Sequence, residues 1–145
     1  MNFLIVTGLS GAGKSMAVNA LEDIGFFCID NIPAGLLPRI LDFAQQGENQ
    51  LSRVAVVMDI RGLHSVQETN EALEALDEKK MPYDILFLDA SDAAIRRRYK
   101  ETRRVHPMTI SEGIPVSEAI TKERQILQPL RERAKYVLSL IHISE

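Results

Sequence analysis

The amino-acid sequence predicts an α/β fold with a mainly parallel sheet flanked by helices, and three observations carry this prediction. Stretches with helical spacing alternate with short apolar runs, as in βαβ units. The runs are continuous rather than alternating, which suits strands that are buried on both faces. A glycine-rich loop, 8–15, joins the first run to the first helical stretch. The runs are Phe3–Thr7, Phe26–Ile29, Val54–Met58 and Ile85–Leu88.

Five helices are expected between and after these runs. The first has Ala17, Leu21 and Ile24 on one side and is ended by Gly25. The last is long and charged, and a kink is expected at its Pro129. The segment 102–115 contains two prolines and a glycine and is either a mobile lid or a long connection. The expected helices are Ser15–Ile24, Ala34–Gln46, Ser65–Glu78, Ser91–Arg104, capped by Ser91 or Asp92, and Val116–Tyr136.

Composition narrows the class of protein. The 145 residues, 46% hydrophobic and 26% charged, suit one globular domain. No apolar run approaches the ~20 residues that a membrane-spanning helix needs. The formal net charge of −3 gives no chain-wide attraction for nucleic acid, so any basic surface must be local. Cys28 is the single cysteine, which fits a reducing compartment, and a cytoplasmic location is expected.

Residues 8–15, GLSGAGKS, match the pattern G-x-x-x-x-G-K-[ST] of a phosphate-binding loop. Its glycines let the backbone approach phosphates closely, so that successive N–H groups point at phosphate oxygens. Lys14 is expected to reach the β- and γ-phosphates, and Ser15 to ligate Mg²⁺. The sequence therefore predicts a P-loop NTPase domain that binds a nucleoside triphosphate through its phosphates. The expected nucleotide-binding residues here are Gly8, Leu9, Ser10, Gly11, Ala12, Gly13, Lys14 and Ser15.

The second half of such a site is an acidic residue at a strand end, which holds Mg²⁺ directly or through water. Asp30, Asp59 and Asp89 follow apolar runs, and in a parallel sheet all three lie on the ligand side. Asp59 is the first choice for the metal, and Lys14 and Asp59 are the expected catalytic residues. Asp30 and Asn31 are the candidates for a second-substrate or sensing position.

The stretch 95–107, IRRRYKETRRVHP, is strongly basic. On a helix, Arg96, Lys100, Arg103 and Arg104 share one face, and Arg97 points elsewhere. Three interpretations stay open: a solvated helical face, an arginine cluster that closes on a transferring phosphate, and a patch for RNA phosphates.

Four segments together resemble the RapZ/YvcJ family of bacterial nucleotide-binding proteins, the RNase adapter proteins. They are VTGLSGAGKS at 6–15, ALEDIGFFCIDNIP at 20–33, DIRG at 59–62 and FLDASDAAIRRRYKETRRVHP at 87–107. The resemblance extends to about Val137 and implies a kinase-like P-loop domain over residues 1–137. It also implies that this domain binds ATP and GTP and hydrolyses them weakly.

By this resemblance, residues 8–15 correspond to the ATP site. Asp59, Ile60, Arg61 and Gly62 fall on the motif that the family assigns to GTP, and Gly62 stands where Asn is common. The resemblance also implies a C-terminal domain that binds small regulatory RNAs or metabolites. We expect these 145 residues not to include it, so RNA binding is not expected of them alone. Residues 138–145 are expected to be an atypical tail, truncated or foreign to the family, with a final strand as the alternative.

Three functions follow from these observations. The leading hypothesis is a regulatory nucleotide-binding module that hydrolyses ATP and GTP slowly with Mg²⁺. The alternative is a small-molecule kinase that uses the same P-loop. The third is a binding adaptor in which the nucleotide is only structural, with a homo-oligomer left open in every case.

Overall fold

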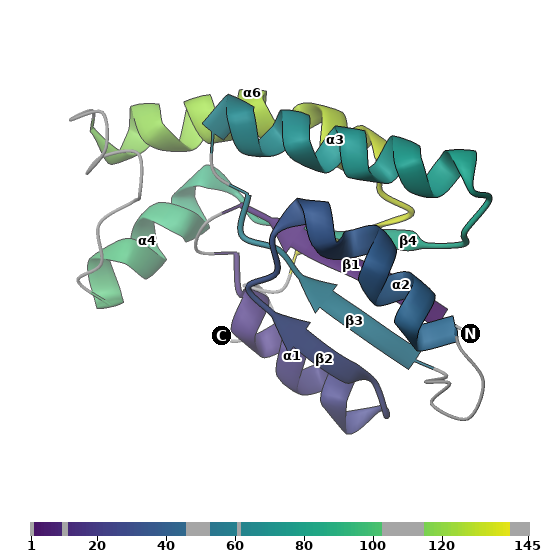
Figure 1. The fold of residues 1–145 in the computed structure, drawn as a ribbon. Helices are drawn as coiled ribbons and strands as arrows, with labels where there is room; N and C mark the ends of the chain where they lie inside the picture. Colours follow the sequence, from purple (N-terminus) through teal and green to yellow (C-terminus); the bar gives the residue numbers. More distant parts are fainter. Residues whose placement is uncertain (1, 10–11, 46–52, 61, 103–114, 140–145) are drawn as a thin grey trace.

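A computed structural model describes residues 2–9, 12–45, 53–60, 62–102 and 115–139. Its centre is a parallel sheet in the order β2-β3-β1-β4-β5 (Figure 1). The α/β prediction with a mainly parallel sheet is therefore confirmed. The strands are β1 (Asn2–Gly8), β2 (Phe27–Asp30), β3 (Arg53–Val57), β4 (Asp84–Asp89) and β5 (Tyr136–Ser139).

Helices cover both faces of this sheet. Helices α3 and α6 run over one face, and α1 lies against the other (Figure 1). The elements are α1 (Lys14–Asp23), the short 3-10 helix η1 (Ala34–Leu36), α2 (Leu37–Gln45), α3 (Gly62–Glu78), α4 (Asp92–Thr102) and α6 (Val116–Arg133).

The core lies along the three central strands. Side chains of β1, β3 and β4 such as Ile5, Val56 and Leu88 are almost fully buried. This burial on both faces explains why their sequences are continuous apolar runs rather than alternating ones. The edge strands differ, because Phe27 of β2 and Tyr136 of β5 are exposed.

Three expected helix boundaries are wrong. The helix predicted from Ser65 begins at Gly62, three residues earlier. The helix predicted to reach Tyr136 ends at Arg133, because Ala134 is extended and the Lys135 amide donates to the carbonyl of Ile85 at 3.1 Å, which starts β5. The helix predicted from Ala34 begins as η1 and becomes α-helical at Leu37. Tertiary pairing with β4 thus overrides the helical pattern at the end of α6.

Other expectations agree with the structure or lie outside it. The amide of Ala94 donates to Ser91 Oγ at 3.1 Å, which confirms the predicted cap of α4. The helix α6 continues through Pro129. Leu138 and Ser139 belong to β5, whereas residues 140–145 are outside the described part, so the atypical tail stays a prediction. Of the predicted lid or connection at 102–115, residues 103–114 are also outside it.

The strand order positions the candidate site. Strands β1 and β3 are neighbours in the sheet. After β1 the chain continues to β2, which lies beyond β3, whereas after β3 it crosses over β1 and continues to β4 on the other side of the sheet. Ligands of open parallel sheets bind at the carboxyl ends of strands where such a reversal occurs. The loop 8–15 follows β1, and Asp59 follows β3.

Candidate nucleotide-binding site

The start of the glycine-rich loop is fixed by its close approach to β4. A Cβ atom placed on Gly8 would lie 2.3 Å from the carbonyl oxygen of Leu88, so only glycine fits there. The next amide, that of Leu9, donates to the same carbonyl at 3.1 Å. Gly13 has φ 96°, a left-handed conformation that favours glycine, and it is the N-cap of α1. The expected Ser10 and Gly11 lie outside the described residues.

Lys14 begins α1 and lies between the loop and the end of β3. Its Nζ atom is 3.4 Å from the carbonyl oxygen of Gly8 and 4.0 Å from Oδ1 of Asp59. The Lys14 side chain is 19% exposed and that of Asp59 is 38% exposed, so both are accessible to a ligand. The structure therefore brings together the two residues that the sequence singled out for catalysis.

A cavity of ≈ 550 Å³ lies beside this pair. That volume is within the range of small-molecule and cofactor sites, about 300–1,000 Å³. Backbone amides at the start of α1 and the positive end of the helix dipole favour an anion next to it. Its lining residues are Lys14, Ser15, Val18, Asn19, Asp30, Asn31, Val57 and Asp59.

The oxygen donors of the cavity fit Mg²⁺. The Ser15 hydroxyl and the carboxylates of Asp30 and Asp59 line it, and hard oxygen ligands suit this ion. Among the described residues no group of three or more His, Cys, Asp or Glu is placed to hold a metal by itself. A magnesium ion here would therefore take most of its ligands from phosphates and water, which is the usual arrangement in nucleotide sites.

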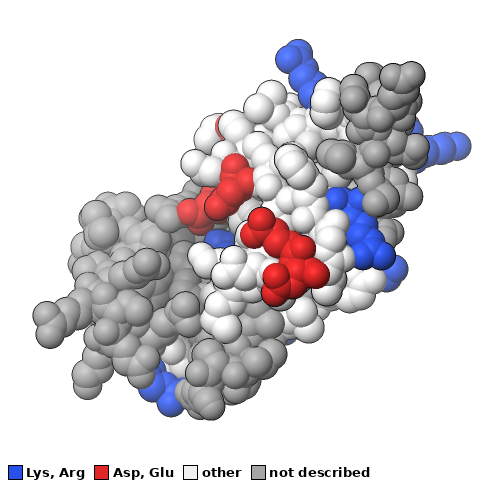
Figure 2. Space-filling view, turned by 90° about the horizontal axis from the view of Figure 1, so that it is seen from below, with Lys and Arg blue, Asp and Glu red and all other residues white. Residues whose placement is uncertain are grey.

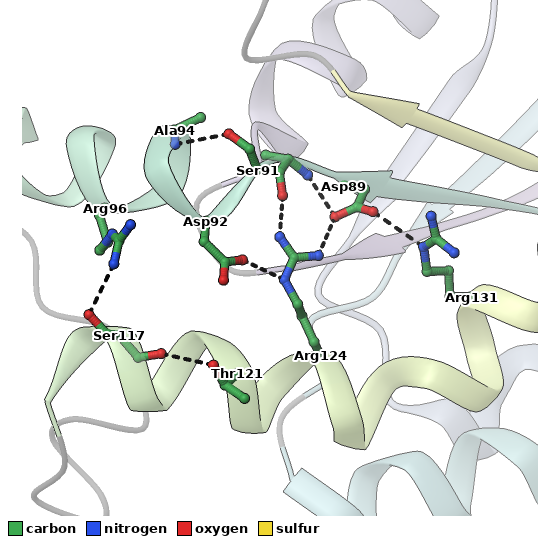
Figure 3. Close-up of polar contacts among 10 residues, drawn as sticks. Asp89, Ser91, Asp92, Ala94, Arg96, Ser117, Thr121, Arg124 and Arg131 are labelled. Atoms are coloured by element: carbon green, nitrogen blue, oxygen red, sulfur yellow. Dashed lines mark hydrogen bonds and ion pairs between the residues drawn. The ribbon is translucent and has the colours of Figure 1, made fainter.

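Asp89, the third strand-end aspartate, is held by arginines of α6 (Figure 3). Arg124 Nη1 lies 2.8 Å from Asp89 Oδ1, and its Nε lies 2.7 Å from Asp92 Oδ1. Arg124 Nη2 also donates to the carbonyl of Ala90, and Arg131 Nε lies 3.2 Å from Asp89 Oδ2. Arg124 therefore ties β4 and α4 to α6, and Asp89 is not among the residues that line the cavity.

The pKa of Asp89 reflects these contacts. Burial alone would raise it, but hydrogen bonds from Arg124 and the Ala90 amide, together with the charges of Arg124 and Arg131, outweigh burial and leave the pKa below its ordinary value. Burial alone would lower the pKa of Arg124, but the carboxylates of Asp89 and Asp92 outweigh it and raise this pKa. Sequence reasoning missed both arginines, because they lie 35 and 42 residues from Asp89 and belong to no local motif.

We expect Arg124→Met to destabilise the fold by about 2 kcal/mol, because Asp89 would keep its charge and lose its principal partner. This corresponds to a melting temperature lower by about 6 °C in thermal unfolding. Because the Asp89 pKa is depressed in the folded state, its contribution is present at neutral pH and fades as pH falls below the ordinary value of 3.8.

The difference between wild type and Arg124→Met should therefore shrink in urea unfolding as pH is lowered from 7 toward 3. Arg39→Met is the control, because Arg39 is exposed on α2 and should cost little. Equal stability of wild type and Arg124→Met at neutral pH would contradict this assignment.

The remaining site candidates are distributed as follows. Ile60 directly follows Asp59 and is 4% exposed, and Gly62 begins α3. Arg61 lies outside the described residues. Of the basic face, Arg96 is exposed on α4 and its Nη1 donates to Ser117 Oγ at 3.3 Å, whereas Arg103 and Arg104 are also outside the described part.

The face on the side of α1 and β2 carries mixed charge. Figure 2 shows acidic side chains near the middle of this face and Lys and Arg side chains mostly toward its margins. The coloured residues form no continuous basic surface on this face. In the described ranges no helix is both long and apolar enough to cross a bilayer.

The sequence was compared with the profiles of known protein families to find the family of this chain. The sequence profile described as RapZ-like N-terminal domain matches residues 1–145. The chain belongs to this family. The RapZ/YvcJ resemblance predicted from the four sequence segments is therefore confirmed.

Relatives in the family are named as nucleotide-binding proteins. One from Alkaliphilus oremlandii is 43% identical over 143 residues, which cover 99% of this chain and 49% of the relative. Another, from Moorella thermoacetica, is 49% identical over 139 residues, covering 93% of this chain and 46% of the relative. The chain thus spans about half the length of these relatives.

Two solved structures share the fold. Shikimate kinase from Bacteroides thetaiotaomicron aligns with a TM-score of 0.57 and 17% identity, covering 97% of this chain and 87% of the kinase. A protein named APE1195 aligns with a TM-score of 0.54 and 16% identity, covering 99% of this chain and 89% of that protein. With the loop 8–15 in place after β1, the kinase-like P-loop NTPase fold is confirmed.

Proposed function

We propose that this domain binds Mg–ATP and Mg–GTP through residues 8–15 and hydrolyses them slowly as a regulatory module. The observation that carries the proposal is the position of Lys14, 4.0 Å from Asp59 and at the edge of a cavity that Ser15 also lines. The relatives' common name, nucleotide-binding protein, supports the same conclusion.

Each residue has a chemical role in this proposal. The loop amides and the N-terminus of α1 bind the phosphate oxygens, and Lys14 balances the charge that develops on them. Ser15 and Asp59 would hold Mg²⁺, which would supply Lewis-acid stabilisation of the phosphates when bound. On binding, Lys14 has to leave the Gly8 carbonyl for the phosphates, a movement within reach of a flexible side chain.

The lining of the cavity supports slow turnover. Among its described residues there is no histidine, glutamine or glutamate to orient an attacking water, and of its two carboxylates Asp59 is assigned to the metal and Asp30 to a second-substrate or sensing position. Binding without rapid hydrolysis suits a domain whose bound nucleotide controls another part of a longer protein. Control of small regulatory RNAs and self-association are proposals for proteins of the relatives' full length and are not assigned to this chain.

The alternative is a small-molecule kinase. It is favoured by one observation, a second cavity that adjoins the nucleotide cavity and shares Asn31 and Asp59 with it. A screen of small hydroxyl compounds with radiolabelled ATP separates the two functions. A saturable phosphorylated acceptor would establish the kinase, whereas release of inorganic phosphate alone supports the slow NTPase.

Removal of the metal ligand tests the proposed site. We expect Asp59→Asn to weaken ATP affinity about tenfold with Mg²⁺ present and to leave it unchanged in EDTA, since one charge-assisted contact to the metal or its waters is lost. Asp42→Asn, an exposed change on α2, should alter neither value. Titration calorimetry measures the ATP affinity with Mg²⁺ and in EDTA for each variant. The same loss of affinity with and without Mg²⁺ would refute the metal role of Asp59.

A further inference from the structure

We infer that the second cavity is a binding site for a small uncharged or cationic molecule that is rich in hydroxyl or amino groups. The cavity has a volume of ≈ 330 Å³ and lies between the ends of β2 and β3 and the first half of α3. This is the lower end of the range for small-molecule sites. Its lining residues are Asn31, Ile32, Pro33, Ala34, Met58, Asp59, Ile60, Ser65, Glu68 and Thr69.

The cavity adjoins the nucleotide cavity at two residues. Asn31 and Asp59 line both. The amide of Asn31 donates to the carbonyl of Val57 at 3.1 Å, and its φ of 58° is unusual for a residue with a side chain. Backbone held in such a conformation is often found at ligand sites. A molecule in the second cavity would therefore lie next to whatever occupies the nucleotide cavity.

One face of α3 supplies hydrogen-bond acceptors to this cavity. Ser65, Glu68 and Thr69 are three and four residues apart, so they share that face. Thr69 is only 2% exposed, and its hydroxyl donates to the carbonyl of Ser65 at 2.8 Å, so its oxygen can only accept from a ligand. Glu68 also lines the cavity, and its Oε1 contacts His64 Nε2 at 2.8 Å.

The charge of the lining decides the class of ligand. Asp59 and Glu68 place two carboxylates around the cavity. Lys14 lies 4.0 Å from Asp59 and His64 lies 2.8 Å from Glu68, but among the described residues no Lys, Arg or His lines the cavity itself. The lining therefore disfavours an anion relative to hydroxyl and ammonium donors. No metal-binding cluster is found in the described ranges, so an organic donor fits better than a protein-held ion. Apolar contacts with Ile32, Met58 and Ile60 suit the carbon skeleton of such a molecule.

Three matched compounds of three carbons each test this inference: serinol, which has two hydroxyls and an ammonium; glycerol; and glycerate, which has a carboxylate. Binding to the 145-residue chain is followed by protein-detected NMR titration, with and without Mg–ATP. We expect serinol to bind at least about tenfold more tightly than glycerate, because the carboxylates favour one charge and oppose the other.

Two variants locate the site. Glu68→Gln should weaken serinol binding about tenfold, because a charge-assisted contact becomes a neutral one. Glu71→Gln removes the same charge from an exposed position on the same helix and should have no effect. Tighter binding of glycerate than of serinol, or an equal loss in both variants, would overturn the inference.

The inference is separable from the proposed nucleotide function. Serinol binding measured without ATP depends only on the cavity that the protein itself forms. If ATP fails to bind while serinol binds and responds to Glu68→Gln, the nucleotide proposal is wrong and the second site stands. If ATP binds and none of the three compounds shifts the resonances of Ser65 or Thr69, the second site is wrong.

Discussion

Replacement of Lys14 by Ala is expected to weaken Mg–ATP binding by at least about a hundredfold. The ammonium group lies 3.4 Å from the Gly8 carbonyl and 4.0 Å from Asp59, at the mouth of the cavity in which the phosphates are proposed to bind. Its removal takes away charge-assisted contacts to two phosphates, each worth about 1.5–3 kcal/mol. Titration calorimetry with a slowly hydrolysed ATP analogue measures the change.

The control is Lys79→Ala, which removes an exposed lysine just after α3 and should leave the affinity unchanged. Because the Lys14 side chain is partly exposed and lines the cavity rather than the core, Lys14→Ala should melt within about 2 °C of wild type. Undiminished nucleotide affinity in the folded variant would contradict the assignment of this loop.

The second large effect is expected for Gly8→Ala, with a loss of about 3 kcal/mol in the free energy of unfolding. The added Cβ would meet the carbonyl oxygen of Leu88 at 2.3 Å and its amide nitrogen at 2.7 Å. Both belong to backbone of the central strand β4, which cannot move without disturbing its pairing with β1. Thermal unfolding should show a melting temperature lower by roughly 10 °C.

Gly35→Ala is the matched control for this substitution. A Cβ at Gly35 meets nothing within 4 Å, so we expect a change within about 0.5 kcal/mol. If Gly8→Ala were as stable as Gly35→Ala, β1 and β4 would have to be farther apart than the structure shows.

The features that the sequence predicted correctly are local or periodic ones. The loop 8–15 contains its own glycines, lysine and serine, so its position between β1 and α1 could be inferred from one segment. The approach of Asp59 to Lys14 needed one more step, the rule that carboxyl ends of parallel strands meet at one edge. The apolar runs predicted four strands. Burial on both faces explains the continuous pattern of β1, β3 and β4, whereas β2 is an apolar run at the edge of the sheet.

The features that it did not predict depend on contacts distant in the sequence. Arg124 reaches Asp89 across 35 residues, and a single arginine on a charged helix gives no sign of its partner. The end of α6 is set by pairing of β5 with β4, which helix periodicity cannot register. The second cavity combines Asn31 with Ser65 and Glu68, residues brought together only by the fold.

Backbone amide NMR can locate bound Mg–ATP on the chain directly. We expect saturation to shift the amides of residues 8–15 and of Asp59 more than any others, and we expect Lys14→Ala to remove these shifts at the same ATP concentration. The largest shifts arising at β5 or on the far side of α6, with residues 8–15 unaffected, would contradict the claim that this loop holds the phosphates.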